Sequence, residues 1–138
     1  MVIGEGPDRA RLELLAGPTV RFLGWQPDSV LRDHYRRCRA LLFPGEEDFG
    51  IAPVESQAAG RPVLALGRGG ALETVLDGET GVFFAQPTVE SLLDGIAAID
   101  RLQADPLRIH EHAKRFDVGR FVPELRRVIE GCLTRARR

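Results

Sequence analysis

The chain has 138 residues, of which 43% are hydrophobic and 28% charged, a composition typical of one folded domain of ordinary size. The formal net charge of −1 does not indicate a nucleic-acid partner, and no apolar run approaches the roughly 20 residues of a membrane span. No charged, apolar and small-residue leader is recognisable, so we expect a cytoplasmic protein. Cys38 and Cys132 lie in apolar helical stripes and are expected to be buried free thiols.

The N-terminal part predicts two short strands, each followed by a helix. Val2-Ile3 is a strand stub, and the turn after it lacks the third glycine of a dinucleotide fingerprint, because position 9 is arginine. A helix is expected from Pro7-Asp8, and the alternating stretch from Thr19 to Leu23 predicts a strand. The next helix begins near Asp28, which suits a helix N-cap and could also accept hydrogen bonds from guanine. We expect Trp25, just before it, to pack rather than to stack on a base.

The centre of the chain predicts a strand, an acidic loop and a helix in succession. The run Ala40 to Phe43 is apolar and indicates a buried strand, and Ile51 to Ala59 indicates a helix closed by Gly60. In an open α/β sheet, ligands bind in the crevice at the carboxyl ends of the strands. The loop between these two elements is therefore the first candidate for a binding site.

The loop after Phe43 combines a glycine, the start of a helix and two carboxylates. Gly50 lets backbone approach a ligand closely, and the amides after it begin a helix, so they suit a phosphate. Glu47 and Glu55 flank this point. Ionised carboxylates only accept hydrogen bonds and would repel a phosphate, so they are better suited to sugar hydroxyls. A phosphate with hydroxyl groups on either side describes a nucleotide sugar. The alternative is an acidic surface loop followed by a solvated helical glutamate.

A second glycine loop follows the next strand. Val63 to Leu66 is a continuous apolar run of the kind found in parallel sheets, and a short helix is expected from Ala71 to Leu76. Between them, Arg68 in the loop 67–70 could reach a phosphate or remain a solvated surface residue. Glu73 is expected to cap or brace this loop.

The C-terminal part predicts a last strand, Gly81 to Phe84, and then helices. Thr88 is expected to cap a helix. The apolar residues of that helix have helical spacing and are expected in the core: Val89, Leu92, Leu93, Ile96 and Ile99. After a break at Asp105-Pro106, a shorter helix runs to about Arg115. The final helix carries one apolar face: Phe121, Leu125, Val128 and Cys132.

Two features of this C-terminal part have alternative interpretations. His110 and His112 are two residues apart and do not share a helix face, so we expect surface or partly packed histidines rather than a metal pair. The arginine-rich segment 126–138 suits a solvated helix end. It could also touch an anionic membrane surface, which would place the protein peripherally at the inner face of the membrane.

The whole pattern resembles the E-x7-E signature of the retaining GT-B glycosyltransferases. Glu47-Asp48-Phe49-Gly50 and Glu55, eight positions after Glu47, carry it, and Ala59 to Val63 continues it. Further segments match in family order over nearly all of the chain: 2–7, 20–24, 69–73 and 77–81. Segments 44–50 and 67–74 look most like the mannosyltransferases of bacterial surface-polysaccharide synthesis.

The resemblance implies an α/β fold. We expect a Rossmann-like parallel sheet of about five strands with helices on both faces, forming a single truncated nucleotide-sugar-binding domain over residues 1–138. The resemblance implies that this domain would be the C-terminal half of a GT-B fold, without its first strand and without the N-terminal acceptor domain. Because that first strand is normally central, its loss would leave a gap. We expect pairing with another chain, as a homodimer or with a separate N-terminal half, or a shift of register, to close it.

The resemblance also implies roles for individual residues. Glu55 would hold the ribose hydroxyls and Glu47 the donor-sugar hydroxyls, neither necessarily as a general acid or base. The amides of Phe49, Gly50 and Ile51 would line the donor sugar and diphosphate. The other donor-binding residues implied are Asp28 at the base and Arg68, Gly69, Gly70 and Glu73 in the donor-side wall.

The donor expected from the resemblance is GDP-mannose, followed by UDP-glucose or another UDP-sugar. No Asp-x-Asp triplet occurs, so we expect no metal, and no other cofactor is implied. The reaction would move a hexose onto a glycan or lipid-linked acceptor, although we expect the isolated chain to be inactive. The alternative is a non-catalytic nucleotide-sugar-binding or interaction module that needs a separate N-terminal half for activity.

Two other classes fit the sequence poorly. A receiver-like α/β domain would need an acidic cluster at a first strand end and a lysine after a late strand. A phosphorylase-type enzyme would need a lysine for pyridoxal phosphate, and the single lysine, Lys114, lies outside every expected strand-end loop.

Overall fold

The computed structural model describes residues 1–136. The chain forms two compact units, and the boundary between them falls between Arg37 and Cys38. None of the helices in residues 1–136 is long and apolar enough to cross a membrane.

The first unit contains two helices, α1 (Arg9–Leu15) and α2 (Asp28–Arg37). The two strands expected here are reduced to one isolated parallel bridge between Val2 and Phe22. The bridge is real pairing, since the Val2 amide donates to the carbonyl of residue 21 at 2.8 Å and its carbonyl accepts from residue 23 at 2.9 Å. It is too short to count as a strand pair, so the expectation of strands at both positions was wrong.

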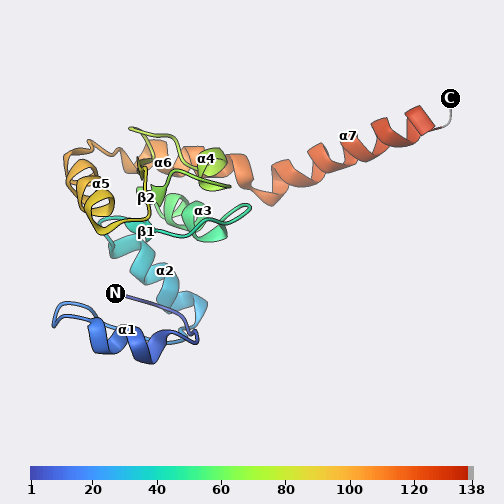
Figure 1. The fold of residues 1–138 in the computed structure, drawn as a ribbon. Coiled ribbons are helices and arrows are strands. Elements are labelled where there is room, and N and C mark those ends of the chain that lie inside the picture. Colours follow the sequence, from blue (N-terminus) through green and yellow to red (C-terminus); the bar gives the residue numbers. More distant parts are fainter. Residues whose placement is uncertain (137–138) are drawn as a thin grey trace. The chain divides into compact units, whose positions relative to one another are not determined.

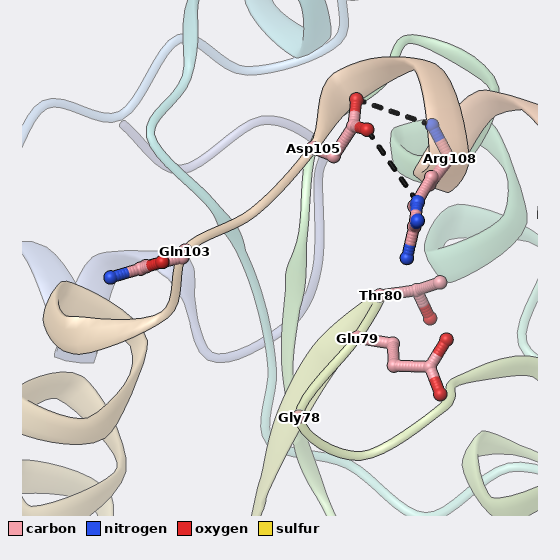
Figure 2. Close-up of a pocket in the computed structure, with 6 residues that line it drawn as sticks. All are labelled: Gly78, Glu79, Thr80, Gln103, Asp105 and Arg108. Carbon is pink, nitrogen blue, oxygen red and sulfur yellow. Dashed lines mark hydrogen bonds and ion pairs between the residues drawn. The ribbon is translucent and has the colours of Figure 1, made fainter.

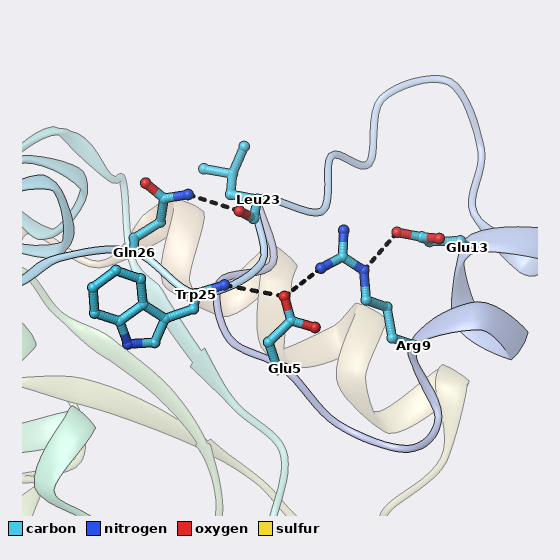
Figure 3. Close-up of polar contacts among 6 residues, drawn as sticks. All are labelled: Glu5, Arg9, Glu13, Leu23, Trp25 and Gln26. Atoms are coloured by element: carbon cyan, nitrogen blue, oxygen red, sulfur yellow. Dashed lines mark hydrogen bonds and ion pairs between the residues drawn. The ribbon is translucent and has the colours of Figure 1, made fainter.

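A polar network centred on Glu5 organises the loops of this first unit (Figure 3). The Glu5 carboxylate accepts from Arg9 Nη1 at 2.6 Å and from the Trp25 amide at 3.2 Å, and Arg9 Nε donates to Glu13 at 2.8 Å. Gly24 adopts φ +65°, and a Cβ there would lie 2.5 Å from Glu5 Oε1. The Trp25 side chain is 73% exposed, so the expectation that it packs was wrong.

The second unit is built on a three-stranded parallel sheet in the order β1 (Leu41–Phe43), β2 (Val63–Leu66), β3 (Gly81–Phe84). The parallel α/β architecture predicted from the sequence is confirmed. The number of strands was overestimated, because the expected N-terminal strands form only the bridge of the first unit.

Helices cover both faces of this sheet, as Figure 1 shows. The central strand β2 is buried along its whole length, and its alternate side chains enter two separate clusters. One cluster lies toward α4 (Ala71–Thr74) and consists of Phe43, Val63, Ala65, Ala71 and Val75. The other lies toward α5 (Val89–Arg101) and consists of Leu64, Leu66, Phe84 and Ile99. Burial on both sides explains why β2 is a continuous apolar run rather than an alternating one.

The cap predicted for α5 is present, because Thr88 Oγ1 accepts from the Ser91 amide at 3.2 Å. The predicted core stripe of α5 was too wide. Ile99 is buried, whereas Val89 and Leu93 are 68% and 58% exposed. A helix that packs on one sheet face buries only the narrow stripe that meets the sheet.

The remaining helices of the second unit are α3 (Ile51–Ala58), α6 (Pro106–Ala113), the short 3₁₀ helix η1 (Lys114–Phe116) and α7 (Val118–Ala136). The apolar residues predicted for one face of α7 are exposed: Phe121, Leu125 and Val128. Cys132 on the same helix is exposed as well, so the expectation of a buried thiol was wrong there. Cys38 is half-buried and is not part of a disulfide, and burial raises the pKa of its thiol above the ordinary value for cysteine.

Candidate functional site

Two glycine-containing loops meet at the carboxyl edge of the sheet. Loop 44–50 follows β1 and loop 67–70 follows β2, and because these strands are adjacent and parallel, their carboxyl ends lie side by side. A hydrogen bond joins the loops directly, from the amide of Gly70 to the carbonyl of Glu47, at 2.7 Å. The two loops singled out from the sequence are therefore one structural feature.

The contact between the loops is backbone against backbone, which explains the paired glycines. Gly69 adopts φ +58°, and a Cβ there would lie 2.5 Å from the carbonyl oxygen of Glu47. A Cβ on Gly70 would lie 2.5 Å from the carbonyl oxygens of both Asp48 and Phe49. No other residue leaves room for the two main chains to approach this closely.

Gly50 ends the first loop and begins α3. It is buried, has φ +80°, and a Cβ there would lie 3.0 Å from Cζ of Phe43. Within residues 1–136, the amides of Phe49, Gly50 and Ile51 donate to no backbone carbonyl. These groups carry the positive end of the α3 dipole, so the start of α3 can bind an anion.

Polar side chains surround this point. Glu47 is exposed on the loop, and Glu55 is exposed on α3, one turn from its start. Arg68 is exposed on the second loop, and Glu73 lies exposed in the first turn of α4. Both signs of charge are thus available around a helix N-terminus, in an arrangement that can hold a phosphate next to hydroxyl groups.

Asp28 lies in the first unit. It is the first residue of α2, and Pro27 takes the capping position, because the amides of residues 30 and 31 both donate to the Pro27 carbonyl. The expectation that Asp28 is the cap was therefore one residue off. Its exposed carboxylate lies in the first turn, where the helix dipole favours it. Its role toward a base remains a prediction.

Behind the loops lies a buried polar layer that sequence reasoning missed. Gln57 of α3 is fully buried, and its Nε2 donates to the carbonyl of Pro53 at 3.1 Å and to that of Thr74 at 2.8 Å. Thr74 Oγ1 in turn donates to the carbonyl of Gly70 at 3.1 Å. These hydrogen bonds link α3 to α4, and α4 to loop 67–70. Local sequence carries no signal for them, since Gln57 and Thr74 are far apart in the chain.

His112 and Phe116 complete this layer from the C-terminal side. His112 Nε2 lies 3.1 Å from the Thr74 carbonyl oxygen. The Phe116 ring packs edge-on against His112 at 6.0 Å and against Phe49 at 5.7 Å between centroids. His110, on the same helix, places its Nδ1 2.7 Å from the Ala58 carbonyl oxygen. The prediction that both histidines are surface or partly packed residues is confirmed, since His110 is exposed and His112 half-buried.

Two of the hollows in the described residues lie in the second unit. The larger, about 660 Å³, adjoins the first loop and is lined by Phe49, Arg115, Phe116, Arg120, Phe121 and Glu124. The smaller, about 320 Å³, lies at the amino end of β3, away from the loops, and is drawn in Figure 2. Its one cation, Arg108, is paired with Asp105 across 3.7 Å. The larger hollow is therefore the one that continues the candidate site.

The described part of the chain contains no group of three histidine, cysteine or acidic side chains placed to hold a metal ion. The absence of a metal requirement remains a prediction of the sequence.

The fold is that of an open α/β domain, and its two joined loops lie at the carboxyl ends of parallel strands, where ligands bind in domains of this class. Residues 1–116 match the family described as glycosyl transferases group 1, and the chain belongs to this family.

Relatives with assigned names are glycosyltransferases. The chain is 41% identical over 70 residues to an alpha-1,3/1,6-mannosyltransferase from Dictyostelium discoideum, a match covering 51% of the chain and 16% of that protein. It is 36% identical over 109 residues to a D-inositol 3-phosphate glycosyltransferase from Nocardia farcinica, covering 75% of the chain and 24% of that protein. The chain therefore spans about a quarter or less of the length of these two relatives.

Solved structures share the fold. The match to the sucrose-phosphate synthase of Thermosynechococcus elongatus has a TM-score of 0.80 at 24% identity and covers 96% of the chain and 38% of that structure. The match to Anabaena HepE in complex with UDP-glucose has a TM-score of 0.77 at 23% identity, covering 94% and 40%. The predicted likeness to glycosyltransferase structures is thus confirmed at the level of the fold.

Proposed function

We propose that the chain is the nucleotide-sugar-binding domain of a retaining glycosyltransferase with an E-x7-E motif, and that its donor is GDP-mannose. The observation that carries this proposal is the hydrogen bond from Gly70 to Glu47, which joins the two glycine loops next to the start of α3. The similarity to a mannosyltransferase supports mannose as the sugar. UDP-glucose is the next candidate, since a structural neighbour was solved with it.

In this proposal the amides of Phe49, Gly50 and Ile51 face the diphosphate and donor sugar. As the bond to the sugar breaks, negative charge grows on the leaving diphosphate, and the α3 dipole stabilises it there. Glu55 accepts hydrogen bonds from the ribose hydroxyls and Glu47 from those of the donor sugar, because each ionised carboxylate supplies only acceptors. Both glutamates thus orient the donor rather than transfer protons.

The other loop residues complete the donor-side wall. Arg68 supplies a guanidinium that can form paired hydrogen bonds with a phosphate. Gly69 and Gly70 let the second loop approach the donor as closely as it approaches the first loop. Glu73 lies beside them at the start of α4. Asp28 of the first unit is proposed to accept from the guanine edge, which would distinguish GDP from UDP.

The proposal is tested by calorimetric titration of the chain with GDP, GDP-mannose, UDP and UDP-glucose. We expect GDP-mannose to bind most tightly. The Glu55→Gln substitution removes the charge and should weaken binding by about tenfold or more, which is the value of one or two hydrogen bonds to a charged group.

Glu90→Gln is the matched control, since Glu90 is an exposed glutamate in the first turn of α5. It should leave the affinity unchanged. Equal weakening by both substitutions, or no binding of any of the four nucleotides by a folded chain, would contradict the proposal.

A second candidate is a non-catalytic module that binds the nucleotide sugar and needs a separate N-terminal half for activity. The two candidates share the same donor site and differ in whether the domain itself takes part in hexose transfer or only binds the nucleotide sugar.

A further inference from the structure

His112 contacts one residue that supports each site loop, and these two residues, Thr74 and Phe116, are the loop anchors. The Thr74 carbonyl, 3.1 Å from its Nε2, ends the helix that begins at the second loop. The Phe116 ring, 6.0 Å from the imidazole, packs in turn on Phe49 of the first loop. The His112 side chain therefore contacts both Phe116, which supports loop 44–50, and Thr74, which ends the helix that follows loop 67–70.

The contact with Thr74 indicates which nitrogen of the His112 ring carries a hydrogen. A carbonyl oxygen only accepts hydrogen bonds, so Nε2 must carry the hydrogen that it donates. Gln57 Nε2 donates to the same Thr74 carbonyl at 2.8 Å, so both lone pairs of that carbonyl oxygen accept a hydrogen bond. Gln57 of α3 and His112 of α6 thus donate to the same Thr74 carbonyl oxygen, and these two hydrogen bonds link the end of α4 to both helices.

Most residues of the two loops are exposed, among them Glu47, Asp48, Phe49, Arg68 and Gly69. The hydrogen bond from Gly70 to Glu47 links the loops directly, beside the close packing of Gly69 and Gly70 against the backbone of residues 47–49. A bond of this kind opens when either loop moves, because the net stabilisation from one hydrogen bond is small. The spacing of the loops therefore depends on how rigidly their anchors are joined.

We propose that His112 is a positioning residue of the donor site, which sets the spacing of the two loops through Thr74 and through the Phe116–Phe49 contact. It touches no substrate itself. The expected effect of His112 on donor binding rests on the proposed function. Its effect on the spacing of the loops is a property of the chain without ligand and can be measured separately.

His110 provides a matched control. It lies on the same helix, and its Nδ1 donates to a carbonyl at 2.7 Å, that of Ala58 at the far end of α3 from the site. His110→Ala therefore removes a histidine-to-carbonyl hydrogen bond of the same kind without touching either loop anchor.

The first measurement is amide hydrogen exchange in the chain without ligand. The reporter is the Gly70 amide, and the reference is the Gly67 amide, which donates to the Phe84 carbonyl at 3.0 Å. We expect His112→Ala to accelerate exchange at Gly70 by roughly tenfold relative to Gly67, because the loops separate more often. His110→Ala should leave the ratio of the two rates unchanged.

Two further variants separate the two contacts of His112. His112→Gln keeps a donor for Thr74 without the aromatic ring, and His112→Phe keeps a ring against Phe116 without the donor. Each should accelerate Gly70 exchange less than His112→Ala, and both retain enough side-chain volume to replace the alanine variant if it does not fold. If Gly70 and Gly67 accelerate equally in every His112 variant, the residue only stabilises the fold and the proposal is overturned.

The second measurement is titration with GDP-mannose and UDP-glucose. If the wild-type chain binds either one, His112→Ala should weaken that binding by roughly tenfold, and His110→Ala should not. Unchanged affinity in His112→Ala would overturn the positioning role. If the wild-type chain binds neither, the proposed function fails, while the exchange ratio at Gly70 still decides whether His112 positions the loops.

Discussion

Gly50 shows how a single residue serves both the fold and the site. From the sequence, its small size suggests close approach of backbone to a ligand. In the structure its φ of +80° begins α3, and the Phe43 ring occupies the space where a Cβ would lie. Internal packing thus requires glycine here even before a ligand binds.

The Gly50→Ala substitution should therefore destabilise the chain by about 1–3 kcal/mol, the usual cost of forcing a non-glycine residue into the left-handed region. Gly45→Ala in the same loop is the control, because it has no positive φ and nothing lies within 4 Å of its Cβ position. Chemical denaturation of both variants measures the difference. A Gly50→Ala variant as stable as Gly45→Ala would show that the loop relaxes without cost.

At the level of elements, the sequence is most informative where apolar runs are long and continuous. β2 and β3 lie where they were predicted: β2 is buried along its whole length, and β3, at one edge of the three-stranded sheet, is buried at both of its ends. The helix α5 was also predicted with its cap, although its buried stripe is narrower than expected. The N-terminal strands were overestimated, because the alternating pattern at 19–23 reports strand propensity and not whether a partner strand lies alongside.

The cap of α5 gives a prediction at this scale. Thr88→Ala removes the acceptor for the Ser91 amide and should lower the free energy of unfolding by about 1 kcal/mol. Thr88→Ser keeps the hydroxyl and should retain most of the stability. Thermal and urea denaturation of the three proteins checks this, and an unchanged stability in Thr88→Ala would mean that solvent satisfies the amide equally well.

For the whole molecule, the exposure of Glu47, Asp48 and Arg68 on the two site loops leads to a prediction about activity. A site formed only by the donor-side loops leaves the reacting sugar open to water and without an acceptor surface. We expect no hexose transfer by the chain alone and measurable transfer once the N-terminal half of a related glycosyltransferase is supplied separately, since catalysis needs charge stabilisation from both sides of the donor.

The measurement is release of GDP from GDP-mannose in the presence of an acceptor extract, with Glu55→Gln as the inactive control. Transfer by the chain alone would contradict this prediction. Absence of transfer with the added half, despite tight donor binding, would contradict it as well and would indicate a domain that binds the nucleotide sugar without taking part in transfer.

The sequence by itself determined the α/β class, the strand–loop–helix order around Glu47 and Glu55, and the second glycine loop, because each depends on local spacing and residue type. Only the tertiary structure decided that the two loops share a hydrogen bond, that Gln57 and His112 converge on the Thr74 carbonyl, and that Phe116 supports Phe49. These contacts join residues far apart in the chain, and periodicity carries no information about which distant side chains meet.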